Sequence, residues 1–178
     1  DVRVPASYMA AGPEFYPLAL EAMLAYANGG MAQLFVALAR HGISPTGLIG
    51  DLPIAIDEDR RALNPVHWDP FCELLRRLEH HVGGSDGLEL CGEWLCSGTQ
   101  PLRLSGFIAF ATSPASLYRT VASLALRRAI PGLEVLVLPA ENNRLRLDIR
   151  LPDALRPCPQ LLHITTGAAR ALPRLLEM

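Results

Sequence analysis

The chain has 178 residues, half of them hydrophobic, so it is long enough to bury a core and is expected to form one domain. Its formal net charge is -2 and it contains no lysine, which excludes the bulk positive charge that holds proteins on DNA phosphates. Arg, Glu or Pro interrupts each apolar run before the roughly 18 residues that a membrane span needs. We therefore expect a cytoplasmic protein with no membrane partner.

Residues 1–15 carry little fold signal. They mix small residues with two prolines, and the run Gly-Pro-Glu-Phe at 12–15 is typical of a remnant of cloning or proteolysis. We expect residues 1–15 to be flexible or foreign to the native protein, and residues 16–178 to form the single domain.

Helical periodicity begins after this segment. Apolar residues three and four positions apart predict a helix over residues 17–27, which we expect to stop at the Asn-Gly-Gly run of residues 28–30. A second helix is predicted over residues 31–41, because Gly42 is a suitable residue to end it.

A short helical turn over residues 45–49 and a connection over residues 50–64 lead to a stronger helix signal. Asn64 is a good N-cap and Pro65 suits the first helical position, so we expect a helix to begin there and to end at the two glycines 83–84. Its buried stripe is predicted to contain Trp68, Phe71, Cys72, Leu75 and Leu78.

Four further helices are predicted along the rest of the chain. The first covers residues 85–96, and an apolar, buried one covers residues 104–111. Ser113 and Pro114 form the next N-cap and first-turn pair, and the last helix is expected over residues 159–171.

The clearest pattern in the sequence is a β-hairpin between these last two helices. Residues 144–151 alternate polar and apolar without an error, as a strand with one buried face does, and residues 133–138 form its partner. The fold class is therefore predicted as α+β, predominantly helical, with a hairpin packed by helices. Two strands alone are marginal in water, so the hairpin needs a packed helix, a further strand or a partner chain.

The four cysteines, at positions 72, 91, 96 and 158, lack the close pairing of a zinc motif. They are most simply small buried thiols, and we expect no metal and no cofactor. None of the common nucleotide-binding, hydrolase or metalloprotease motifs occurs in the chain, so we do not expect an enzyme.

Three stretches together resemble a known family. They are residues 38–45 (Leu-Ala-Arg-His-Gly-Ile-Ser-Pro), residues 88–92 (Leu-Glu-Leu-Cys-Gly) and residues 105–153, which begin Ser-Gly-Phe-Ile-Ala-Phe-Ala-Thr-Ser-Pro and run through the hairpin. In this order the chain resembles, over residues 31–176, the N-terminal effector domain of AraC/XylS-superfamily transcription regulators. The type is the arabinose-binding-like domain of ornithine-utilisation regulators.

The resemblance implies a ligand-sensing, dimerising regulatory domain of a bacterial transcription regulator. Its expected partners are a small-molecule effector and a second copy of the chain, and DNA would be bound only by a helix-turn-helix module absent from this chain. We therefore expect residues 16–178 to be an effector or sensor domain, cut short at its C-terminus. The alternative is an input or protein-interaction domain of another signalling protein, such as a sensor kinase.

Five residues are candidate ligand contacts. Trp68, Tyr118 and His163 combine an apolar body with a polar tip on helices expected to face the core, and Arg119 and Arg128 suit a ligand that carries a carboxylate. Packing in the core is the alternative role for all five. The arginines at positions 144, 146 and 150 share one strand face, which we expect to be a solvated or edge-protecting face, with an anion site as the minor alternative.

Overall fold

The computed structural model describes residues 27–63, 66–98, 118, 133–140, 144–153 and 155–172. Within these ranges the chain forms five helices and one two-stranded antiparallel sheet, which confirms the predicted α+β class. The elements are α3 (Ala27–Arg40), α4 (Pro45–Ile49), α5 (Trp68–His81), α6 (Ser85–Gly98), β1 (Glu134–Ala140), β2 (Arg144–Arg150) and α10 (Pro159–Ala171). The segment 1–15, the predicted helices over 104–111 and from Pro114, and the hairpin turn lie outside the described residues.

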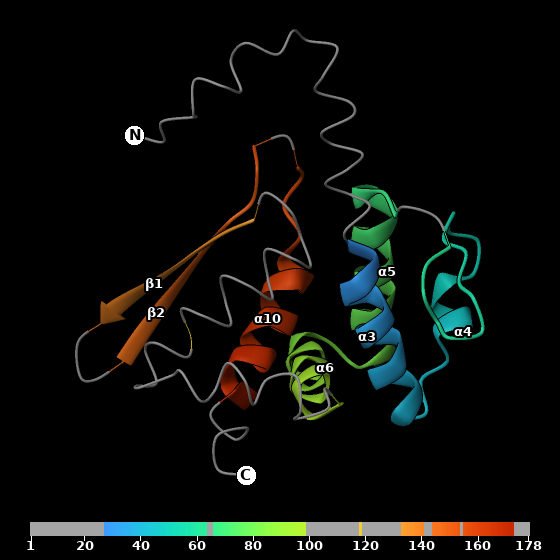
Figure 1. The fold of residues 1–178 in the computed structure, drawn as a ribbon, viewed down its shortest axis with the longest axis horizontal. Coiled ribbons are helices and arrows are strands. Elements are labelled where there is room, and N and C mark those ends of the chain that lie inside the picture. The colour runs from blue at the N-terminus through green and yellow to red at the C-terminus, as the bar shows by residue number, and fades with distance from the viewer. Residues whose placement is uncertain are drawn as a thin grey trace, which may run out of the picture.

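The helices gather on one side of the molecule and the hairpin reaches out on the other (Figure 1). In this view α3 and α5 overlap on the side away from the strands, α4 lies beyond them, and α10 lies between this group and the strands. No helix in the described part of the chain is long and apolar enough to cross a membrane.

The core lies between the helices and takes in the start of the hairpin. Burial of this apolar surface is the main force that holds the elements together. The largest side chains with almost no exposure are Phe35, Met31, Leu38, Leu74, Leu75, Leu78, Leu88, Val66 and Cys91. The stripe predicted for α5 is buried as expected, together with Leu74, and the hairpin contributes Leu133 and Val135.

The predicted break at residues 28–30 is wrong, because α3 runs unbroken from Ala27 to Arg40. Asn and Gly are poor helix formers, but the cost of about 1 kcal/mol for each Gly is small beside the burial of apolar side chains. Met31 and Phe35, one turn apart, are both almost fully buried. The predicted end is confirmed, since Gly42 has the positive φ of 79° that ends a helix.

The predicted start of the next helix is also wrong, because α5 begins at Trp68 and not near Pro65. The physical reason is Pro70. A proline beyond the first turn of a helix lacks an N–H for the helical ladder and collides with the carbonyl four residues earlier. With the helix starting at Trp68, Pro70 falls within the first turn, where its missing N–H costs nothing.

The hairpin forms where the alternating pattern predicts it. Each strand has seven residues, and Val135 pairs with Ile149 and Val137 with Leu147 on the face that packs toward the core. The opposite face of the hairpin carries Leu136, its cross-strand partner Asp148 and the other polar residues of the two strands.

Helices α6 and α10 make the closest backbone contact in the described structure. A Cβ atom added to Gly167 of α10 would lie 1.7 Å from the carbonyl oxygen of Glu89. One added to Gly92 of α6 would lie 2.0 Å from the carbonyl oxygen of Ile164. Only glycine permits such an approach, so these two positions determine how the helices cross.

Candidate functional site

A groove of about 540 Å³ lies between β2 and α10. This volume lies within the range of pockets that hold small-molecule ligands. The strand contributes residues 146–150, and the helix contributes Leu162, Thr165 and Thr166.

The groove follows the edge of β2 that does not pair with β1. Side chains of a strand alternate between its two faces, so five consecutive residues can line one groove only along an edge. In the described residues β2 is hydrogen-bonded to β1 alone. Backbone N–H and C=O groups of β2 therefore join the side chains as potential contacts for a ligand.

The groove combines positive charge with an apolar wall. Arg146 and Arg150 stand at either end of the strand segment, and Asp148 between them accepts a bond of 2.6 Å from Nε of Arg146. Leu147 and Ile149 supply the apolar surface. With two arginines against one aspartate, the strand side of the groove favours an anionic group.

The helix side offers hydrogen-bond acceptors. The hydroxyl of Thr165 donates to the carbonyl of Leu161, and that of Thr166 donates to the carbonyl of Leu162, both over 2.8 Å. Because each hydroxyl proton is already used within the helix, the free capacity of these oxygens is to accept. A ligand that carries an anionic group, a donor and an apolar body matches this lining.

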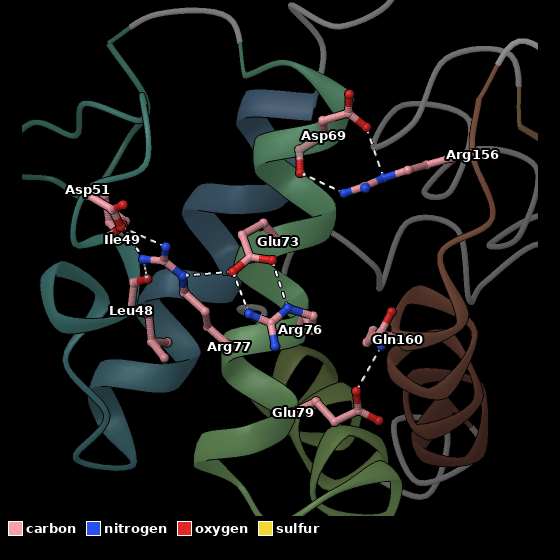
Figure 2. A network of polar contacts seen from close by, with 10 residues as sticks. All are labelled: Leu48, Ile49, Asp51, Asp69, Glu73, Arg76, Arg77, Glu79, Arg156 and Gln160. Carbon is pink, nitrogen blue, oxygen red and sulfur yellow. Dashed lines mark hydrogen bonds and ion pairs between the residues drawn. The ribbon is translucent and has the colours of Figure 1, made fainter.

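Helix α5 is held by polar contacts on two sides, as Figure 2 shows. On one side Arg77 donates to the carbonyls of Leu48 and Ile49 and pairs with Asp51 at 2.7 Å. These are the last carbonyls of α4, which have no partner within their own helix. Hydrogen bonding to Arg77 lowers the pKa of Asp51.

On the other side of α5 lies the chain that leads into α10 (Figure 2). Arg156 pairs with Asp69 at 2.9 Å, and Gln160 donates to Oε2 of Glu79 over 2.8 Å. These two contacts hold the start of α10, and the residues just before it, against α5.

The structure gives each described candidate residue a partner elsewhere in the fold. Nε1 of Trp68 donates to the carbonyl of Arg156 over 2.9 Å, and the hydroxyl of Tyr118 donates to the carbonyl of Ala169 over 3.0 Å. Nδ1 of His163 lies 3.7 Å from Oε1 of Glu89. None of the three lines the groove.

The remaining two candidates, Arg119 and Arg128, lie outside the described residues. The described residues also contain no group of three or more His, Cys, Asp or Glu side chains that could hold a metal ion.

Comparisons with models of protein families, with curated proteins and with solved structures find no match to this chain. The groove is therefore judged by its own chemistry.

For one side of this groove the sequence offered an anion site only as the minor alternative to a solvated strand face, and for the other side it offered no signal. The arginine face of the strand was visible in the alternating pattern, and Arg146 and Arg150 do line the groove. Thr165 and Thr166 carried no signal, because which face of a helix meets a distant strand is set by tertiary packing. The two threonines directly precede Gly167, the residue at which α10 approaches α6. This placement can be recognised only once the fold is known.

Proposed function

We propose that this chain is a ligand-sensing, dimerising regulatory domain of a bacterial AraC-type transcription regulator. The groove between β2 and α10 is the observation that carries the sensing part of this proposal. Binding of DNA is assigned to a helix-turn-helix module of the parent protein, in keeping with the family that the sequence resembles.

The ligand class follows from the lining of the groove. Arg146 and Arg150 attract a carboxylate or another small anion, and the hydroxyl oxygens of Thr165 and Thr166 accept from a ligand N–H or O–H. Small amino or hydroxy acids with an apolar side chain fulfil both conditions. A ligand that bridges β2 and α10 favours the arrangement in which the two are held together, and this shift of population is the regulatory signal.

Thermal unfolding in the presence of small carboxylic acids, including the amino acids, tests this proposal. A ligand at 100 times its Kd stabilises a protein by about 2.7 kcal/mol, which raises the Tm of a chain of this size by several degrees. We expect at least one such compound to do so, and we expect the double variant Arg146→Ala, Arg150→Ala to lose the shift.

The matched control is Arg61→Ala. It removes an exposed arginine that is distant in sequence from the residues of the groove. It should leave the shift unchanged. Absence of stabilisation by every compound, or an equal loss of the shift in both variants, would count against the groove as the ligand site.

The dimer is proposed on the outer face of the hairpin. Leu136 and Leu138 of β1 are 42% and 40% exposed, which gives a strand of a marginal two-stranded sheet an apolar outer surface. Leu138→Glu places a carboxylate opposite Arg146, its cross-strand partner, so the hairpin itself should tolerate it. Sedimentation velocity should show a dimer that this variant converts to a monomer.

The control for the dimer is Leu63→Glu, since Leu63 is 63% exposed in the loop before α5.

The exposed Leu136 and Leu138 also suit the second candidate function, which is docking on another signalling protein such as a sensor kinase. A wild-type chain that sediments as a monomer at all concentrations favours that second function.

A further inference from the structure

Two buried thiols from distant parts of the sequence meet between α5 and the start of α10. Cys72 lies on the buried face of α5, and Cys158 is the N-cap residue of α10. Both belong to the hydrophobic core, with exposures of 6% and 3%, and both are free thiols. Their thiol groups interact with each other.

The backbone on both sides of this contact is held in place. Trp68 and Asp69, at the start of α5, bind the carbonyl and the guanidinium of Arg156, two residues before Cys158. Gln160, two residues after Cys158, binds Glu79 further along α5. The thiol contact therefore lies between the Asp69–Arg156 ion pair and the Glu79–Gln160 hydrogen bond, both drawn in Figure 2, which hold the segment around Cys158 against α5.

The two sulfur atoms are chemically unequal. The contact between the two thiols lowers the pKa of Cys158 and raises that of Cys72, and the Cys158 thiol donates to Oε1 of Gln160 over 3.8 Å. Cys158 also stands at the N-terminal end of a 13-residue helix, where the helix dipole favours negative charge. Cys158 is thus the sulfur that ionises first.

Access to Cys158 requires little movement. Cys158 is itself 3% exposed, but its neighbours Pro157 and Pro159 are both exposed. Hydrogen peroxide is close to water in size, and local opening of a short segment between two prolines is enough to admit it.

We propose that Cys72 and Cys158 form an oxidisable pair, with Cys158 as the attacking thiolate, Cys72 as the resolving thiol and a peroxide as the oxidant. The Cys158 sulfur attacks one peroxide oxygen, the O–O bond breaks, and hydroxide leaves and takes up a proton as water. Cys158 is then a sulfenic acid. The Cys72 sulfur attacks the Cys158 sulfur, the S–S bond forms, and the S–OH group leaves as water with the proton of the Cys72 thiol. One peroxide is reduced to two waters as two thiols become one disulfide.

The disulfide turns a non-covalent contact into a covalent link between α5 and α10. Since α10 forms one wall of the groove, oxidation at Cys158 acts on the element that carries Leu162, Thr165 and Thr166 without touching the groove itself. The site is distinct from the proposed ligand site and does not depend on it.

The test uses the wild-type chain treated with hydrogen peroxide and then alkylated under denaturing conditions. We expect its mass before alkylation to be lower by two hydrogen atoms, two of the four cysteines to resist alkylation, and a proteolytic map to join the peptides of Cys72 and Cys158. Reduction with dithiothreitol should reverse all three results.

Cys91 is the matched control within the same chain. It is fully buried in α6, and burial raises its pKa to about 11, so it should react with iodoacetamide in the native state at least about tenfold more slowly than Cys158. In Cys72→Ser, peroxide should leave a sulfenic acid on Cys158 that dimedone traps. In Cys158→Ser, Cys72 should remain a free thiol.

Three results would overturn the proposal. They are four alkylatable thiols after peroxide, a disulfide that involves Cys91 or Cys96, and native reactivity of Cys91 equal to that of Cys158. The alkylation count and the proteolytic map of the wild-type protein decide the first two even if a serine variant fails to fold.

Discussion

Two glycines have more influence on this fold than most of its larger residues. At Gly167 a Cβ atom would lie 1.7 Å from the carbonyl oxygen of Glu89, and no rotation of a side chain relieves a collision with backbone. We expect Gly167→Ala to lower the free energy of unfolding by about 3 kcal/mol, the upper part of the range for overpacking, because α6 and α10 must move apart. Urea unfolding followed by circular dichroism measures the change.

Gly47 provides the control for this prediction. It lies in α4, and a Cβ atom there would come no closer than 3.8 Å to another atom. Gly47→Ala should be neutral or stabilise the protein by about 0.5–1 kcal/mol, since alanine loses less backbone entropy in a helix. Equal effects of the two substitutions would show that the helix contact is looser than described.

The ionisation of Glu73 makes the free energy of unfolding depend on pH in the acid range. Hydrogen bonds from Arg76 and then Arg77 lower its pKa from 4.5 to about 2. A carboxylate with a depressed pKa in the folded state stabilises that state fully above its unfolded pKa and loses the contribution as pH falls toward the folded one. We expect the unfolding free energy to fall between pH values of about 4.5 and 2, and the fall to be shallower in Glu73→Gln. Identical pH profiles for the two proteins would contradict this.

At the scale of elements, α4 depends on a residue from another helix. Arg77 of α5 binds the carbonyls of Leu48 and Ile49 at the C-terminal end of α4, where the hydrogen bonds of α4 itself do not reach them; the Ile49 carbonyl also accepts from the N–H of Leu52. We expect Arg77→Met to speed amide hydrogen exchange in residues 46–52 while exchange in α5 changes little. The methionine keeps the apolar stem of the side chain, so packing is preserved.

Arg76→Met is the control, because in the described part of the chain the side-chain hydrogen bonds of Arg76 run to Glu73 of the same helix. Exchange in α4 should be unaffected by it. Faster exchange in α4 with both variants would point to a general loosening of α5 and not to a contact made by Arg77.

The sequence predicts elements well where the signal is local. The alternation over residues 144–151 places β2, Pro159 marks the start of α10, and the apolar stripe of α5 is buried as its spacing requires. Predictions failed where a local rule competed with packing or with a second local rule. The run at residues 28–30 remains helical because Met31 and Phe35 are buried, and Pro70 outweighs Asn64 and Pro65 in setting the start of α5.

The candidate site was only partly predictable for the same reason. The arginines of β2 can be seen in the sequence pattern of a single strand, whereas the groove forms only because α10 faces that strand. Trp68, Tyr118 and His163 were singled out for their chemistry, and each binds a partner far away in the sequence. The meeting of Cys72 and Cys158 likewise has no sequence signal, because nothing in their spacing predicts that α5 and α10 touch.

For the whole molecule, the hairpin and the helices should unfold as one unit. Leu133, just before β1, is 2% exposed and belongs to the same core cluster as the helices. We expect Leu133→Ala to lower the free energy of global unfolding by about 2–5 kcal/mol, and Leu63→Ala, at an exposed position, to change it by less than about 0.5 kcal/mol. Fluorescence and circular dichroism should give coincident transitions, and separate transitions would show that the hairpin is independent.

The glycine contact between α6 and α10 also has a mechanical consequence. Helices whose backbones touch cannot slide or rotate against each other without collision, so a force applied to α10 moves α6 with it. The indole of Trp94 on α6 stacks on the ring of His41, with centroids 3.8 Å apart, at the end of α3. A displacement of α10 beside β2 is therefore transmitted through α6 to the end of α3. The fluorescence emission of Trp94 should report this displacement.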